Sequence, residues 1–155
     1  MSAVPRWLLI GLCLLRAPMA HGQALTVRPL QNLNFRFLLP GVNTTVDALQ
    51  FTQSGQIEIK ASIGANFEIR YTLPTALIGQ GTTIPLVFST TSGAAAPSSA
   101  PSSATRFNPN NATRWRFMTT NTATFFLGGQ ARPRVGQPTG AYTAPVVVTI
   151  TNLGL

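Results

Sequence analysis

The sequence has one cysteine, Cys13, and one histidine, His21, among its 155 residues. Acidic side chains are also scarce, since Asp47, Glu58 and Glu68 are the three in the chain. Cysteine or histidine takes part in the common nucleophile–base pairs and in nearly all transition-metal sites, so this chain has few ways to build them. Calcium needs several converging oxygen ligands, and one aspartate is too few. The composition therefore predicts no catalytic residue, no cofactor and no metal site.

The first 22 residues have the pattern of a secretory signal peptide. Arg6 supplies the positive charge, Trp7–Leu15 is an apolar run of nine residues, and small residues offer a cleavage site after Gly22. Cleavage after Ala24 is the alternative. The apolar run is shorter than the roughly 20 residues that span a bilayer. We predict a leader at 1–22 and an exported protein, in the periplasm, at the cell surface or outside the cell, with no transmembrane segment in its mature chain.

Removal of this leader changes what the mature chain contains. Cys13 and His21 leave with it, and so do Arg6 and Arg16, which leaves nine of the 11 basic residues against three acids. A chain of the remaining length can bury about two-thirds of its surface without a disulfide or a metal. We therefore predict a single domain at residues 23–155.

Short stretches of alternating apolar and polar residues dominate the remainder, and none has the spacing of an amphipathic helix. Gln56–Ala61 and Phe67–Leu73 alternate without interruption. Further strands are predicted at Leu33–Phe37, Ile84–Phe88, Phe125–Leu127 and Tyr142–Ile150. Glycine and proline separate these stretches, as expected of turns. The pattern predicts an all-β, antiparallel sandwich.

Two arrangements are open for the stretch Ile57–Leu73. In the first, its strands form a hairpin around Ile63–Ala65, which places Glu58 opposite Arg70. In the second, the chain crosses between two sheets and the apolar faces meet in the core. In both, Glu58 and Glu68 have basic neighbours on polar strand faces. This is typical of solvated ion pairs rather than of the paired carboxylates of a glycosidase.

Residues 90–105 have a low-complexity composition of serine, alanine, proline and threonine. Such a segment is typical of a linker or of a disordered loop with nothing to bury. The halves on either side are too short to hold a core alone, which favours a loop within one domain.

Arginines lie beside aromatic or proline residues at two places, Arg114-Trp115-Arg116 and Arg132-Pro133-Arg134. On a strand, Arg114 and Arg116 share one face and Trp115 points to the other. Scattered surface arginines are the simplest interpretation. The sharper hypothesis is that Arg114, Arg116, Arg132 and Arg134 contact an acidic polysaccharide or another polyanion. Nucleic acid is not an expected partner, because export separates the protein from most of it.

Three blocks of the sequence fit one known order of motifs. They are Leu33–Phe35 with Leu39–Gly41; Gly55–Ile59, Gly64–Ile69 and Leu73–Pro74; and Leu127–Gly129 with Gln137–Thr143 before the last strand. This order resembles the bacterial domain of unknown function 4402 family, a relative in style of spore-coat-U-like and pilin-like secreted proteins. The family has Phe-Gly where this chain has Phe35-Arg36, and an aromatic in its final strand, which this chain lacks.

The resemblance implies an immunoglobulin-like sandwich at the cell surface, with like subunits or a periplasmic chaperone and usher as partners. Pilin-like domains accept a strand from a neighbour at an open sheet edge. Leu25 and Val27 are candidates for the start of a donor strand, although the start of the domain's own first strand is the simpler interpretation. Val146, Val148 and Ile150 are expected on one side of the last strand, in a closed core or beside an acceptor groove.

Two functions follow from these expectations. The leading one is a non-catalytic, secreted or cell-surface structural protein, a pilin-like fibre subunit assembled by strand addition. The alternative is a monomeric binding module that recognises surface glycans or another polyanion through its arginines.

Overall fold

The chain folds into antiparallel strands, as its alternating pattern predicts. The computed structural model describes residues 25–97 and 101–154, so the predicted leader, with Cys13 and His21, lies outside the described residues. The described part contains twelve strands and one 3-10 turn, with no α-helix. The elements are β1 Thr26–Gln31, β2 Thr44–Val46, β3 Gly55–Lys60, β4 Asn66–Thr72, β5 Ala76–Gly79, β6 Thr82–Val87, β7 Gly93–Ala96, η1 Pro101–Ser103, β8 Thr105–Phe107, β9 Thr113–Arg116, β10 Thr122–Leu127, β11 Gly129–Ala131 and β12 Val147–Gly154.

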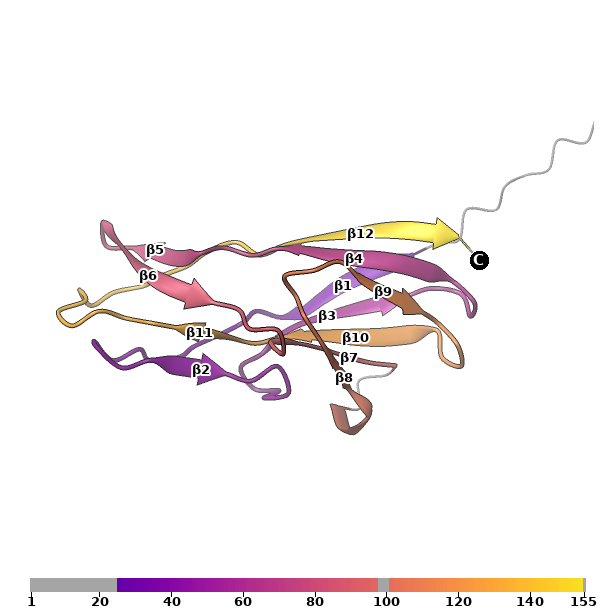
Figure 1. Cartoon of the computed structure of the whole chain (residues 1–155), viewed down its shortest axis with the longest axis horizontal. Coiled ribbons are helices and arrows are strands. Elements are labelled where there is room, and N and C mark those ends of the chain that lie inside the picture. Colours follow the sequence, from indigo (N-terminus) through magenta and orange to yellow (C-terminus); the bar gives the residue numbers. More distant parts are fainter. Residues whose placement is uncertain (1–24, 98–100, 155) are drawn as a thin grey trace, which may run out of the picture.

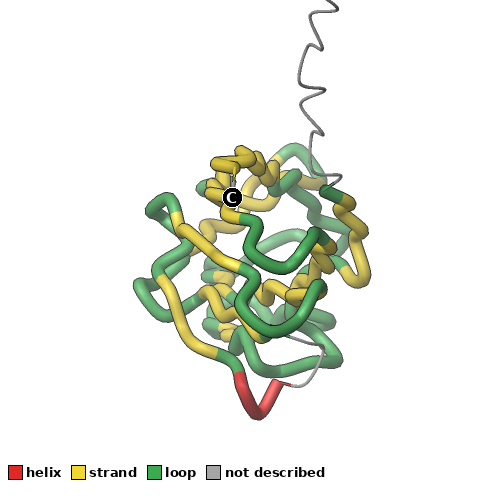
Figure 2. The backbone as a smooth tube through the Cα atoms, turned by 90° about the vertical axis from the view of Figure 1, so that its right-hand side faces the viewer, coloured by secondary structure: helices red, strands yellow, loops and turns green. Residues whose placement is uncertain are grey.

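The strands form three sheets in a sandwich-like arrangement. A five-stranded sheet has the order β1-β3-β10-β7-β8, and a three-stranded sheet has the order β12-β4-β9. A four-stranded sheet, β2-β11-β6-β5, occupies one end of the long axis, where β10 continues into β11 (Figure 1). Seen end-on, η1 lies at the opposite side of the molecule from the C-terminal end of the described chain (Figure 2). Strands from both halves of the chain are paired within the same sheets.

A buried aromatic and aliphatic cluster lies between the five-stranded and the three-stranded sheets. Ile59 of β3 contributes to it from one sheet, and Phe67 and Ile69 of β4 from the other. Phe125 of β10 makes ring contacts with Phe67, at a centroid distance of 6.0 Å. All four side chains have at most 1% of their surface exposed, so this cluster holds the two layers together.

The course of the chain between β3 and β4 decides between the two arrangements left open by the sequence. β3 pairs with β1 and β10, whereas β4 pairs with β12 and β9. The two strands therefore belong to facing sheets, and the hairpin alternative is wrong. Glu58 is paired with Arg28, at 3.3 Å, instead of with Arg70.

The low-complexity stretch at 90–105 contains a buried strand. β7, Gly93–Ala96, pairs with β10 on one side and β8 on the other, and its four residues are buried. A Cβ atom at Gly93 would lie 2.6 Å from the ring of Phe107, so the small residues let aromatic rings lie directly against this strand. The expectation that this stretch has nothing to bury is therefore wrong for β7.

Two predicted strands also differ from the structure. Leu33–Phe37 is not a strand, because Arg36 has a φ of 56° and its backbone N–H donates to Asn34 Oδ1 at 2.7 Å, which breaks the extended chain. The last strand begins at Val147 rather than Tyr142, since Pro145 interrupts the approach to it. The strands predicted at Gln56–Ala61, Phe67–Leu73, Ile84–Phe88 and Phe125–Leu127 are confirmed within one to three residues at their ends.

Candidate functional site

An apolar groove of about 1100 Å³ opens between the sheets on one side of the molecule. Its floor is made by side chains from four strands, with Ile57 from β3, Tyr71 from β4, Leu86 from β6 and Phe125 from β10. No aspartate, glutamate, histidine or cysteine of the described residues lines it, and Arg36 is the charged residue that does. A groove of this composition suits apolar side chains and offers no acid–base pair.

Two lengths of chain form the rims of this groove. One rim is the end of β1 and the segment after it, from Pro29 to Pro40. The other rim runs from Gln137 to Val148, at the start of β12. β1 has β3 as its partner and β12 has β4, and each is the edge strand of its sheet in the described part of the chain. Each rim therefore includes a short length of open strand edge, from β1 or β12, and the rest of it is loop.

The rim at Gln137–Tyr142 is held in place by its own polar side chains. The Tyr142 hydroxyl donates to the carbonyl of Pro138 at 2.8 Å and accepts from Gln137 Nε2 at 3.0 Å. The backbone N–H of Gln137 donates to the Arg134 carbonyl at 3.1 Å. The next residue of the rim, Thr143, exchanges two backbone hydrogen bonds with Ile78 of β5, at 2.8 and 3.0 Å. The rim is therefore held both by its own side chains and by β5.

The predicted inward face of the last strand is found where the sequence places it. Val146, Val148 and Ile150 are partly buried and pack against the core between the sheets. Val146 and Val148 line the groove, and Val147 between them is 52% exposed on the opposite face. The alternation is that of a strand with one side toward the core.

Leu25 and Val27 take part in the fold of their own chain. Val27 belongs to β1 and lies opposite Ile59 in β3, and Leu25 packs against the core between the sheets. The simpler of the two sequence interpretations, that they begin the domain's own first strand, describes this arrangement. Neither residue lines the groove.

The four arginines proposed to contact a polyanion fall in two separate places. Arg114 and Arg116 are exposed on β9, with Trp115 turned to the core, where its ring lies 5.3 Å from that of Phe125. With Asn66 and Leu153 these residues line a small depression of about 320 Å³. Arg132 and Arg134 follow β11, which lies apart from β9 along the long axis (Figure 1). The structure thus does not bring the four arginines together.

The three carboxylates of the chain are all engaged in ion pairs. Glu58 contacts Arg28 at 3.3 Å and Lys60 at 3.6 Å. Glu68 contacts Arg70 at 3.3 Å and Arg114 at 3.6 Å. Since Glu58 and Glu68 lie in facing sheets and each is held by basic neighbours, they do not form a catalytic pair.

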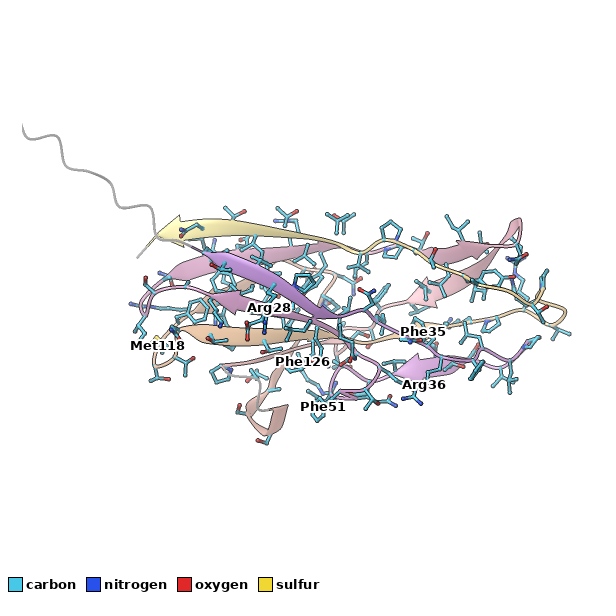
Figure 3. All side chains as sticks on the ribbon, turned by 180° about the vertical axis from the view of Figure 1, so that it is seen from behind. Arg28, Phe35, Arg36, Phe51, Met118 and Phe126 are labelled. Atoms are coloured by element: carbon cyan, nitrogen blue, oxygen red, sulfur yellow. The ribbon has the colours of Figure 1, made fainter. Side chains whose placement is uncertain are left out.

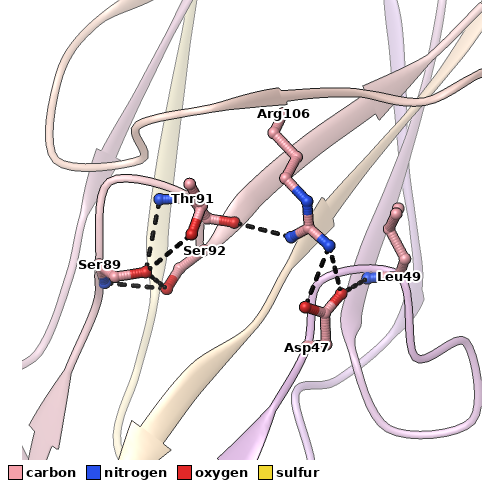
Figure 4. A network of polar contacts seen from close by, with 6 residues as sticks. All are labelled: Asp47, Leu49, Ser89, Thr91, Ser92 and Arg106. Atoms are coloured by element: carbon pink, nitrogen blue, oxygen red, sulfur yellow. Dashed lines mark hydrogen bonds and ion pairs between the residues drawn. The ribbon is translucent and has the colours of Figure 1, made fainter.

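Asp47 is held most closely of the three. Arg106 Nη2 contacts both of its carboxylate oxygens, at 3.0 and 3.1 Å, and Arg106 Nη1 donates to the Thr91 carbonyl at 3.0 Å (Figure 4). The backbone N–H of Leu49 donates to Asp47 Oδ1 at 2.8 Å. Burial raises the pKa of Asp47, but the bonds from Leu49 and Arg106 outweigh it and leave the pKa below its ordinary value. This network connects the segment before β7, strand β8 and the end of β2.

Sequence reasoning missed most of the groove. Tyr71, on its floor, is buried, and burial raises the pKa of its phenol, so the hydroxyl remains protonated. Leu33–Phe37, within the first rim, was expected to be a strand, and its apolar residues gave no sign that they border a groove. The usable signal was the alternation that turns Val146, Val148 and Ile150 inward, since two of these residues line the groove.

No group of three or more histidine, cysteine, aspartate or glutamate side chains among residues 25–97 and 101–154 could hold a metal ion. Within the same ranges, no helix has the length and hydropathy needed to cross a membrane. Comparison with protein-family models and with curated protein sequences found no match to this chain.

Proposed function

We propose that this chain is a non-catalytic, secreted or cell-surface structural protein, a pilin-like fibre subunit with an immunoglobulin-like fold that assembles by strand addition. One observation carries the proposal: a groove of about 1100 Å³, with apolar side chains on its floor, lies beside the edge strands β1 and β12. The crossing of the chain from β3 to β4 between facing sheets supports the immunoglobulin-like topology. The motif order shared with the domain of unknown function 4402 family supports the same assignment.

An added strand would satisfy both features of the groove at once. Its backbone would hydrogen-bond to the open edge of β12 or β1, and its alternate side chains would enter the apolar floor. β12 is eight residues long, so a donor of about that length would match it. The donor is an extended segment of a neighbouring like subunit, and a periplasmic chaperone would occupy the groove in the same way before assembly. Leu25 and Val27 are engaged in the fold of their own chain, so β1 would have to leave its place beside β3 to act as that donor.

Single cysteines on β12 can test this proposal. Since Cys13 lies in the predicted leader, protein purified after export contains no other thiol to react. We compare Val148→Cys, which points into the groove, with Val147→Cys, its neighbour on the exposed face. Alkylation rates are measured in dilute and in concentrated protein, with light scattering to follow assembly.

Strand addition predicts that assembly slows alkylation at position 148 and leaves position 147 reactive. In dilute monomer, both thiols should react. A protein that stays monomeric at every concentration contradicts the proposal, and so does assembly that leaves the thiol at 148 as reactive as in the monomer. Because both changes are from valine to cysteine, their effects on folding are small and comparable.

The alternative, a monomeric module that binds a glycan or another polyanion, is favoured by a separate observation. Arg116, Arg132 and Arg134 are exposed, and no carboxylate of the described residues lies within ion-pair distance of them. A heparin column with a salt gradient tests it, since binding by arginines weakens as salt rises. Arg116→Gln should then elute earlier than the parent protein.

A further inference from the structure

The end of the molecule formed by the four-stranded sheet exposes apolar side chains in two neighbouring loops. Phe37 is 94% exposed and Leu39 63%, in the loop before β2. Val135 is 91% exposed, in the loop after β11, and Val42 is 51% exposed, two residues before β2. We call these four residues the apolar tip. We propose that the apolar tip and the arginines beside it dock onto an anionic lipid bilayer.

The two loops of the apolar tip are held side by side. β2 and β11 pair antiparallel with Thr44 opposite Ala131, and the same register continues to a bond from the Gly41 N–H to the Arg134 carbonyl at 3.1 Å. A Cβ atom at Gly41 would lie 3.0 Å from Val135 Cγ2, which places Val135 against this turn. The exposed side chains of both loops therefore belong to one surface.

Phe37 lies two residues before a tight turn of the same loop, Leu39–Val42. The Val42 N–H donates to the Leu39 carbonyl at 3.1 Å, which closes a tight turn across Gly41. Phe37 precedes Leu39 by two residues, so their Cα atoms lie within about 7 Å. Phe37 and Leu39 thus belong to one loop, which the bond from Gly41 to Arg134 joins to the loop of Val135.

The charges at the apolar tip are of one sign. Arg36, Arg132 and Arg134 lie within its two loops, and all three are exposed. No carboxylate of the described residues lies within ion-pair distance of them, because the three acids of the chain are paired elsewhere. Arg132 Nε donates to Gln130 Oε1 at 2.6 Å, which orients its side chain and leaves its charge uncompensated. Such a surface is complementary to anionic headgroups.

Arg36 also occupies a backbone conformation that arginine rarely adopts. Its φ of 56° lies in the left-handed region, where a side chain is strained and glycine is favoured. Strain of this kind persists where the local structure imposes it, often at functional positions. A cation held at this position, next to Phe37, is consistent with a contact that needs both charge and apolar surface.

The degree of exposure favours a bilayer over other occupants. Side chains as exposed as Phe37 and Val135 project singly from the surface, whereas a protein interface usually presents apolar residues packed against one another. A glycan would use the arginines but not the projecting phenylalanine and valine. Apolar side chains flanked by cations are the pattern of proteins that lie at the headgroup boundary of anionic membranes.

The test is flotation of protein purified after export with vesicles of phosphatidylglycerol and phosphatidylcholine, and with vesicles of phosphatidylcholine alone. The key variant is Phe37→Ser combined with Val135→Ser. Its matched control is Ile63→Ser combined with Met118→Ser, since these side chains are 59% and 68% exposed. Figure 3 shows Met118 at one end of the long axis and Arg36 in the other half of the molecule. Vesicle binding by Arg134→Gln, at the apolar tip, is likewise compared with that of its control, Arg116→Gln on β9.

We expect the tip variant to bind anionic vesicles at least about ten-fold more weakly than the parent, and the control to bind like the parent. Arg134→Gln should lower binding about five-fold, and added salt should lower it further. Equal loss in the tip variant and its control overturns the proposal, as does equal binding to neutral vesicles. Two further results also overturn it: self-association abolished by the tip variant, which assigns the surface to a second copy, or heparin binding alone, which assigns it to a polyanion.

Discussion

The two long sides of the sandwich are built differently. On the closed side, the connection from β8 to β9 crosses from one sheet to the other (Figure 1). Phe107 and Trp115, in the two strands that it joins, pack against the core. Both rings contact Phe125, at centroid distances of 6.1 and 5.3 Å. On the open side, no described segment crosses between the edge strands β1 and β12, and the groove lies between them.

This difference shows that one side of the sandwich is covered by its own chain, whereas the other side has room for a further strand. The closed side covers its core with aromatic rings from both sheets. The open side leaves the outer edges of β1 and β12 without a strand partner in the described part of the chain, which is costly for an isolated protein because water must solvate their backbone groups. An added strand would cover the core on the open side, as the connection from β8 to β9 covers it on the closed side.

The largest effect should come from the same substitution made on the two sides. Phe107→Ala removes a ring that contacts Tyr71 and Phe125 and covers Gly93, and it should lower the free energy of unfolding by about 3 kcal/mol. Phe37→Ala, on the open side, removes a ring that is 94% exposed and should change it by less than about 0.5 kcal/mol. Denaturant titrations of both variants give the comparison, and equal losses would mean that the open side is covered in the free protein.

A second, smaller effect tests the strand that lies behind the closed side. Ala95 in β7 is 1% exposed within the core between the sheets, so Ala95→Leu should overpack it and cost about 1–3 kcal/mol. Ser102→Leu, at an exposed position of the same low-complexity stretch, is the control and should cost less than about 0.5 kcal/mol. If both changes are neutral in chemical unfolding, β7 is not the buried strand described above.

The strands of this protein also show how much of the fold could be predicted from the sequence. The alternation of Gln56–Ala61 and Phe67–Leu73 predicts strands correctly, because β-branched and aromatic residues with period two suit a half-buried sheet. β7 could not be predicted in this way, because a run of glycine and alanine has no alternation of apolar and polar residues. Its burial depends on aromatic rings of the neighbouring strands β8 and β10. Leu33–Phe37 alternates but is not a strand, because the backbone turns at Arg36. The alternation of apolar and polar residues cannot predict such a turn.

The groove could be predicted only in part. The inward face of Val146, Val148 and Ile150 follows from alternation, but a groove exists only where two edges lie apart in space. Its rims are far apart in the sequence, at 29–40 and 137–148, and no local signal reports the gap between them. The arginines at 132 and 134 gave a charge signal, yet their apolar neighbours became visible only once the two loops were placed together.

A third test concerns Arg36, at the end of the open side. Arg36→Gly relieves a left-handed conformation and should raise the free energy of unfolding by about 0.5–1 kcal/mol. The same variant should bind anionic vesicles more weakly, since it removes one cation of the apolar tip. Arg116→Gly, on the exposed face of β9, should instead lower stability, because glycine weakens a strand. A destabilised Arg36→Gly protein would show that the side chain makes a contact more important than the strain.

The smallest effect concerns the ion pair that braces β8 on the closed side. Asp47 has a pKa below its ordinary value in the folded protein, so its contribution to stability is fully present above about pH 4–5 and disappears as the pH falls through the lower, folded-state pKa. The side chains of Asp47 and Arg106 are 54% and 39% exposed, so solvent screening limits the contribution to about 0.5 kcal/mol. Asp47→Asn should therefore lose this amount at neutral pH and show a flatter decline in acid than the parent. Unfolding titrations at several pH values measure both, and parallel curves for parent and variant would show that the brace contributes nothing to the closed side.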